Sequence, residues 1–132
     1  MGLFDFLKKR NKKAEESLTI EQRVDNLWQD WIRGKTTQPL TDIMTFLSNL
    51  GACGHADFFE ICEKDEKLAL VANKVLPMLP SVINNNYQTA KKIYLVTPKE
   101  KRDEDFLNEY DDFFYDQEEL VNDFLLSFLS DK

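Results

Sequence analysis

The chain has 132 residues, of which 42% are apolar and 31% are charged, and its net charge at pH 7 is −7. This length fits a single domain, and the negative charge disfavours direct nucleic-acid binding because phosphates would be repelled. Four glycines and four prolines are too few for an all-β fold full of tight turns, and no apolar stretch is long enough to span a bilayer.

The first 18 residues form a basic, amphipathic extension that differs from the domain expected over residues 19–132. Apolar side chains are followed by a basic run, a pattern typical of a short interfacial anchor on anionic lipid. We favour the alternative, a frayed start that docks on the domain or has no order, because about six helical residues bury little area. The extension does not read as a secretory signal, so we expect a cytoplasmic protein, with peripheral membrane contact only if the anchor forms. The expected membrane contacts are Leu3, Phe4, Phe6, Leu7, Lys8 and Lys9.

The first helix of the domain is predicted from a capping box, in which Thr19 is followed three residues later by Gln22. Apolar residues then recur at spacings of three and four, and Gly34 is a suitable stop. Two tryptophans share the apolar face, which favours a place in the core over stacking on a ligand.

A second helix is predicted to open at Pro39 and to end at Gly51. The glycines at 51 and 54 indicate a tight turn, and a further helix containing His55 is expected to follow it.

Asp65 is predicted to cap a helix that Pro77 and Pro80 bring to an end. Residues 81–97 fit either a helix or a strand. We predict a helix, with a bend at the asparagines 84–86, because a lone strand would find no partner elsewhere in the chain.

Two more caps are expected near the end of the chain. Thr97, Pro98 and Glu100 predict a helix over Pro98–Tyr115, and the carboxylates after Tyr115 predict a last helix over Gln117–Ser130. These two helices are expected to pack antiparallel. The fold class is therefore all-α, a single compact domain of six or seven helices.

Neither a metal site nor a catalytic site is predicted. Cys53, His55 and Cys62 do not have a known zinc spacing, and both cysteines are expected to be free, buried thiols. The only histidine lies too close along the chain to Cys53 for a nucleophile–base pair, and no phosphate-binding or dinucleotide motif occurs. We therefore expect no cofactor and no enzymatic activity.

The run Asp103–Asp123 is the remaining feature with a functional meaning. It holds ten acidic residues and neither lysine nor arginine, but it also carries apolar residues at helical spacing, as folded helices do. Such helices present carboxylates that attract a basic partner. The alternative is a solvated outer face that only keeps the protein soluble, although such faces usually interleave both signs of charge.

Three segments resemble the DNA-mimic-protein-like family, a bacterial family of helical domains. They are the stretch from Asn49 to Glu60 with its glycines and paired phenylalanines, the helix ending in Leu79-Pro80, and the acidic-aromatic stretch from Tyr110 to Leu120. The resemblance covers about residues 20–130, but the glycine turn is interrupted and the basic extension lies outside the pattern. The resemblance implies an all-helical, non-enzymatic domain. The family is named after a member that mimics double-stranded DNA and occupies the DNA-binding face of a transcription factor.

The sequence as a whole predicts a protein-binding domain that presents an acidic helical surface to a basic protein, with DNA mimicry as one form of this binding. A membrane-surface adaptor held by residues 1–13 is the alternative, and a structural role is another. The expected partner-binding residues are Asp103, Glu104, Asp105, Asp111, Asp112, Asp116, Glu118 and Glu119.

Overall fold

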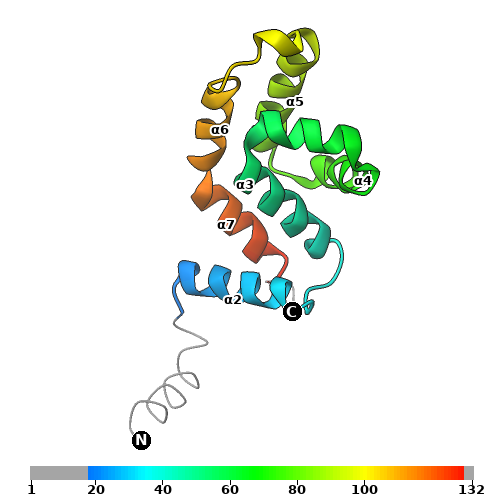
Figure 1. The fold of residues 1–132 in the computed structure, drawn as a ribbon. Helices are drawn as coiled ribbons and strands as arrows, with labels where there is room; N and C mark the ends of the chain where they lie inside the picture. Colours follow the sequence, from blue (N-terminus) through cyan, green and yellow to red (C-terminus); the bar gives the residue numbers. More distant parts are fainter. Residues whose placement is uncertain (1–17, 130–132) are drawn as a thin grey trace, which may run out of the picture.

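A computed structural model describes residues 18–129, which form one compact all-α domain, as predicted (Figure 1). This part of the chain contains six α-helices, two 3₁₀ helices and no strand. The elements are α2 (Ile20–Ile32), α3 (Leu40–Lys64), α4 (Glu66–Val75), η1 (Leu76–Met78), α5 (Ser81–Val96), η2 (Lys99–Lys101), α6 (Asn108–Tyr115) and α7 (Glu118–Ser127). The six predicted membrane contacts lie outside the described residues.

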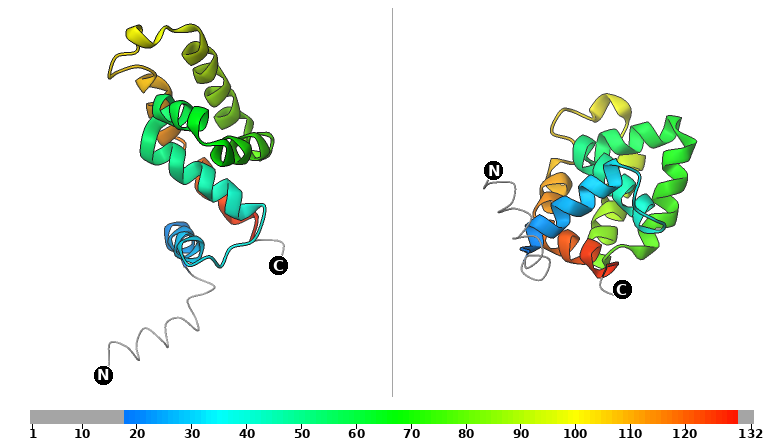
Figure 2. Two further views of the ribbon diagram at one scale, coloured as in Figure 1. Left: turned by 45° about the vertical axis from the view of Figure 1, so that its right-hand side comes forward. Right: turned by 90° about the horizontal axis from the view of Figure 1, so that it is seen from below.

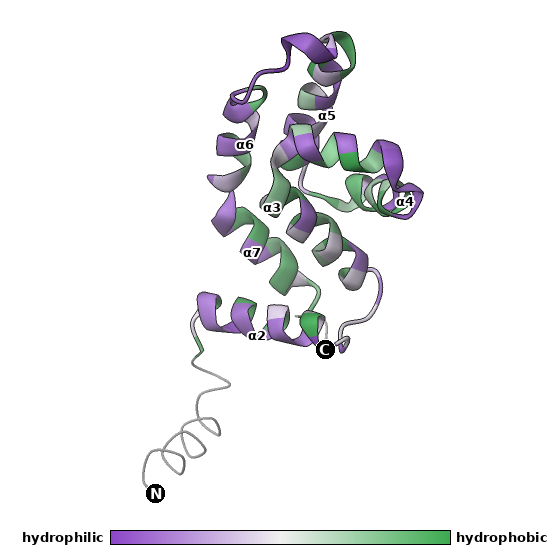
Figure 3. Ribbon diagram, viewed as in Figure 1, coloured by the Kyte–Doolittle hydropathy of each residue, from purple (hydrophilic) through white to green (hydrophobic). Residues whose placement is uncertain are grey.

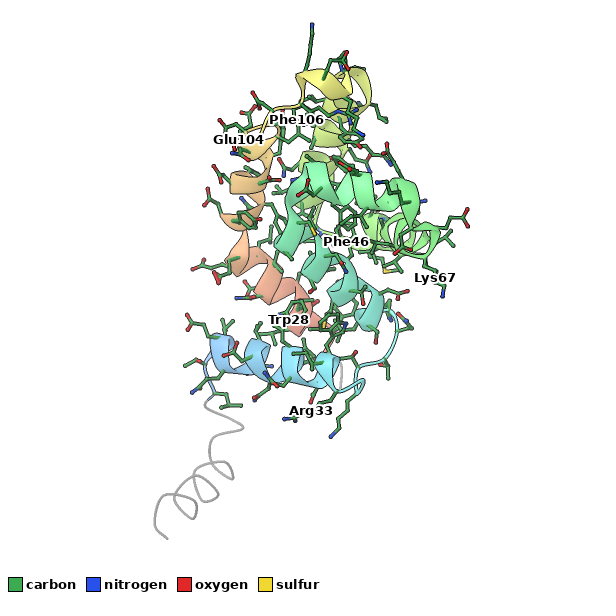
Figure 4. The ribbon with its side chains drawn as sticks, in the orientation of Figure 1. Trp28, Arg33, Phe46, Lys67, Glu104 and Phe106 are labelled. Carbon is green, nitrogen blue, oxygen red and sulfur yellow. The ribbon has the colours of Figure 1, made fainter. Side chains whose placement is uncertain are left out.

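Helix α3 runs through the centre of the domain, with α4, α5 and α6 packed around it and α2 across one end (Figures 1 and 2). Its apolar face is rich in aromatic rings. The Phe46 side chain lies on α3 inside the domain (Figure 4). Its ring lies 5.2 Å from that of Phe58 and 5.5 Å from that of Tyr87 on α5, and all three side chains are buried. Offset and edge-on contacts of this kind add to the free energy of burying the rings.

Helix α2 begins and ends as the sequence predicts. The Thr19 hydroxyl accepts a hydrogen bond from the backbone N–H of Gln22, and the Gln22 side chain accepts one from the N–H of Thr19. Gly34 follows the helix with a φ of 71°. The two tryptophans are half-buried and pack against the core, edge to face at 5.4 Å, which confirms their predicted structural role.

The prediction that Gly51 ends a helix is wrong. Gly51 lies within α3, and the helix is interrupted three residues later at Gly54, where φ is 81° and ψ is 168°. A single glycine costs a helix only about 1 kcal/mol, so packing of the apolar face on both sides carries α3 through Gly51. The conformation at Gly54 is one that only glycine adopts readily.

Helices α4 and α5 also form where they are predicted. The Asp65 carboxylate accepts hydrogen bonds from the N–H groups of Lys67 and Leu68 at the start of α4. The bend predicted at the asparagines is wrong, since α5 is helical throughout. Two of these side chains bond to distant backbone carbonyls: Asn84 donates to Leu76 and Asn86 donates to Tyr110.

The predicted helix Pro98–Tyr115 is wrong as well. The Thr97 hydroxyl donates to the Ile93 carbonyl inside α5 instead of capping a new helix. The Arg102 guanidinium then donates to the carbonyls of Tyr94 and Thr97, which closes the end of α5. The chain turns, and α6 begins only after Leu107, a buried residue with a φ of 65°.

The C-terminal helices are not an antiparallel pair. Asp116 and Gln117 join α6 to α7 with backbone angles close to helical, so the chain bends but does not reverse (Figure 1). Helix α6 packs on α3 and α5, whereas α7 packs on α2. The two helices therefore follow one another along one side of the domain.

The two glycines of α3 should respond in opposite ways to alanine. Gly51→Ala should raise the free energy of unfolding by about 0.5–1 kcal/mol, because alanine favours helix and a Cβ there would meet only a Phe114 ring atom at 3.9 Å. Gly54→Ala should lower it by about 2 kcal/mol or more, because φ is positive. Urea denaturation measures both, and equal effects of the two substitutions would contradict the position of the break.

Candidate protein-binding surface

Nine of the ten carboxylates in Asp103–Asp123 are exposed. Within residues 18–129, none of these nine forms an ion pair with a basic side chain. They therefore create a region of uncompensated negative charge, which we call the acidic surface. Its members are Asp103, Glu104, Asp105, Glu109, Asp112, Asp116, Glu118, Glu119 and Asp123.

The acidic surface follows the chain from the turn before α6 to the middle of α7. Glu104 points outward from this turn (Figure 4), and the hydrophilic side of α6 faces away from α3 and α5 (Figure 3). Glu118 and Glu119 lie in the first turn of α7, where the helix dipole favours negative charge. The segment that carries the predicted residues thus runs along one side of the domain (Figure 1), and all of these residues except Asp111 are exposed.

A groove of about 430 Å³ between α2 and α7 extends the acidic surface. Ile20 and Glu21 at the start of α2 line one side of it, facing residues from α7 that include Glu118 and Glu119. Sequence reasoning missed Glu21 because nothing in its local pattern relates it to a helix almost a hundred residues away.

Apolar side chains are also exposed on these helices. Phe113 and Tyr115 of α6 are 40% and 49% exposed, and Leu120 of α7 is 37% exposed. The Tyr115 hydroxyl donates to the Gly51 carbonyl at 3.0 Å, which ties this ring to α3. Aromatic area beside carboxylates is a composition suited to protein contacts.

Asp111 has a different place from the other predicted binding residues. Its side chain is 17% exposed, and its Oδ1 atom lies 2.7 Å from both the backbone nitrogen and the Nδ1 atom of His55. His55 is the first residue after the break at Gly54, where the second half of α3 begins. Asp111 therefore caps that half-helix from α6 and is committed to the fold.

The close approach at this contact also requires a glycine. A Cβ on Gly54 would lie 2.7 Å from the Oδ2 atom of Asp111, well inside van der Waals contact. Gly54, His55 and Asp111 thus form one unit that joins α3 to α6.

His55 is a buried core residue, with an exposure of only 1%. Rings of Phe59, Tyr87 and Phe114 surround it at centroid distances of 6.0–6.2 Å. Burial lowers the pKa of His55, against the opposing effect of its hydrogen bond and ion pair with Asp111. A neutral ring that donates from Nδ1 to the carboxylate fits this site, because Nε2 has no hydrogen-bond partner among the described residues.

Other kinds of site are not apparent in the described part of the chain. No group of three or more His, Cys, Asp or Glu side chains there is arranged to hold a metal ion. Cys53 and Cys62 are free, as predicted, but the prediction that they are buried is wrong, since both are partly exposed. None of the helices in residues 18–129 has the length and apolar character needed to cross a bilayer.

The chain matches no protein-family model, no curated protein and no solved structure. The resemblance to the DNA-mimic-protein-like family therefore stays a prediction from the sequence, and the functional argument depends on the geometry of the domain.

Neighbouring aspartates of α6 should differ sharply when they are replaced. Asp111→Ala should lower the free energy of unfolding by about 2–4 kcal/mol, because it leaves two buried groups of His55 without a partner. The matched control Asp112→Ala should change it by less than about 0.5 kcal/mol, since that side chain is exposed and unpaired. Urea denaturation of both variants measures the difference, and similar losses would show that the Asp111 contact does not stabilise the fold.

Stability should also depend on pH through His55, the only histidine in the chain. Its pKa is below the ordinary value of 6.5 in the folded protein and returns to that value on unfolding. The unfolded chain then binds the extra proton first, so stability is complete above pH 6.5 and falls as the pH drops toward the folded pKa. The slope should reach at most about 1.4 kcal/mol per pH unit.

Urea denaturation between pH 5.5 and 7.5 checks this slope. A His55→Gln variant is the control, and its stability should be nearly flat over the same range. Stability of the unmodified protein that stays constant or increases toward pH 5.5 would contradict the lowered pKa.

Proposed function

We propose that this protein is a non-enzymatic binding domain that presents the acidic surface to a basic protein partner. The observation that carries this proposal is the set of nine exposed carboxylates for which residues 18–129 supply no ion-pair partner. Each exposed ion pair contributes only about 0.2–1 kcal/mol, so the surface acts through their number. It steers a basic partner over distances near the Debye length of about 8 Å at physiological salt.

The exposed rings complement the charge. Charge alone raises association rates and selects the sign of the partner, but affinity generally comes from a few desolvated aromatic anchors. Phe113 and Tyr115 lie between the carboxylates of α6 and are available for this role. A partner with basic residues around an apolar depression would match this arrangement.

The finer form of the proposal is DNA mimicry, in which the partner is a DNA-binding protein. Helices α6 and α7 have 8 and 10 residues and are joined by Asp116 and Gln117, so residues 108–127 extend over at most about 30 Å. One strand of DNA carries about nine phosphates over that length. The two helices and their link present six exposed carboxylates over it, a comparable linear density of charge: Glu109, Asp112, Asp116, Glu118, Glu119 and Asp123.

A pair of charge-matched variants tests the proposal. The surface variant replaces Asp112→Asn, Asp116→Asn and Glu119→Gln, while the control replaces Asp30→Asn, Asp57→Asn and Glu66→Gln, which are exposed elsewhere. Each variant loses three negative charges. Proteins captured from the native cell at low salt and eluted at high salt are identified, and the affinity of the main one is measured for each variant.

The surface variant should bind the partner at least about tenfold more weakly than the control variant at 0.15 M salt. Affinity of the unmodified protein should fall with salt, and duplex DNA should displace the partner if mimicry applies. Equal binding by the two variants would refute the acidic surface as the binding site. If duplex DNA does not displace the partner, DNA mimicry is refuted, but the acidic surface remains the proposed binding site.

A further inference from the structure

A second site lies on the side of α3 that faces α4 and α5. It is a pocket of about 170 Å³, walled by residues from all three helices. Aromatic rings of Phe59, Tyr87 and Tyr94 form one side, and the small side chains of Ala69 and Ala72 leave room on the other. The space is similar to an apolar cavity of roughly 150 Å³ that accepts a benzene-sized molecule.

The hydroxyl of Tyr94 is the first sign that the pocket is built for a polar occupant. Tyr94 is only 3% exposed, and its hydroxyl has no hydrogen-bond partner of standard geometry among the described residues, the Glu63 carboxylate being near it but not well placed. A buried hydroxyl without a partner costs free energy, and a tyrosine normally finds a partner when it is buried. Phenylalanine would fill the same space without this cost, so the hydroxyl requires an explanation.

The second indication of a polar occupant is that side chains of opposite charge line the pocket. Lys91 of α5 and Glu63 of α3 both line it, yet within residues 18–129 neither forms an ion pair with the other or with any third residue. Both charges act on ionisable side chains that line the pocket, namely Cys62 and Tyr94. Lys91 opposes the rise in the pKa of the Cys62 thiol that burial causes. Glu63 adds to the rise in the pKa of Tyr94 that burial causes, because its carboxylate is close enough to act on the Tyr94 hydroxyl as an acceptor and through its charge, although the contact is not a hydrogen bond of standard geometry.

We propose that this pocket binds a small zwitterion, namely a free α-amino acid with a compact apolar side chain. Its carboxylate would meet the Lys91 ammonium, and its ammonium would meet Glu63 and the Tyr94 hydroxyl. The apolar side chain would lie against Phe59 and Ala72. Two opposite charges that line one pocket without pairing match a molecule that carries both charges, and a volume of about 170 Å³ in a pocket partly open to solvent suits a molecule near the size of valine. This site is separate from the acidic surface and does not depend on the function proposed for it.

The experiment is a titration of the full-length, ¹⁵N-labelled protein with L-valine, followed by NMR. Amide signals of α3, α4 and α5 around the pocket should shift and saturate with a dissociation constant of about 1 mM, as expected for so small a ligand. Isovalerate lacks the ammonium and isobutylamine lacks the carboxylate, so each should bind at least about tenfold more weakly.

Three variants make the assignment specific. Lys91→Met should weaken binding about tenfold or more, whereas Lys92→Met at the exposed neighbouring position should leave it unchanged. Tyr94→Phe keeps the packing and should weaken binding about three- to tenfold.

Several results would overturn the proposal. The first is the absence of saturable shifts up to 20 mM valine, a range set at about twenty times the expected dissociation constant. The others are equal binding of valine and its two analogues, and equal effects of the two lysine variants on binding. A Tyr94→Phe variant that binds valine like the unmodified protein would equally refute the role of the hydroxyl.

Discussion

The contact between Asp111 and His55 is the interaction on which the arrangement of this domain depends. An interrupted helix leaves backbone N–H groups without partners where its second half begins, and inside a core those groups are costly. At the break in α3, a single carboxylate oxygen from α6 serves both the backbone and the ring of His55 at 2.7 Å. The pairing joins segments 56 residues apart and explains why Gly54 has room for no larger side chain.

The same contact determines which way the acidic surface faces. Asp111 and the buried Phe114 are one helical turn apart on α6 and both point toward α3. The residues between and beyond them, including Asp112 and Asp116, are consequently turned to solvent. One aspartate of the run is therefore committed to stability, whereas its neighbours are available to a partner, although the residue type is the same.

Two buried polar atoms lack a hydrogen-bond partner among the described residues, and their different surroundings lead to different interpretations. The Nε2 atom of His55 lies among aromatic rings, where a neutral nitrogen can remain unpaired and burial keeps the ring uncharged. The Tyr94 hydroxyl belongs instead to a residue that lines a pocket with unpaired charges. The fold alone accounts for the unpaired Nε2 atom of His55, whereas the unpaired hydroxyl of Tyr94 is one basis of the proposed ligand site.

The sequence by itself determined the features that depend on neighbours three or four residues apart. The capping box of Thr19 and Gln22 and the Asp65 cap were both predicted, because the interactions that create them lie within one helical turn. The local pattern of α5 was ambiguous, and its helical class followed only from the lack of a second strand in the sequence. The part of the acidic run from Asn108 onward was recognisable as folded helix for the same reason, whereas residues 103–107 form a turn.

Only the tertiary structure decided which local signals are used. Thr97 and Pro98 resemble a cap as closely as Thr19 does, but Arg102 closes α5 there and α6 begins ten residues after Pro98. Gly51 and Gly54 look alike in the sequence, yet only Gly54 faces the Asp111 carboxylate. The inward position of Asp111 and the nearness of Glu21 to α7 likewise arise from packing between distant segments, which no local pattern records.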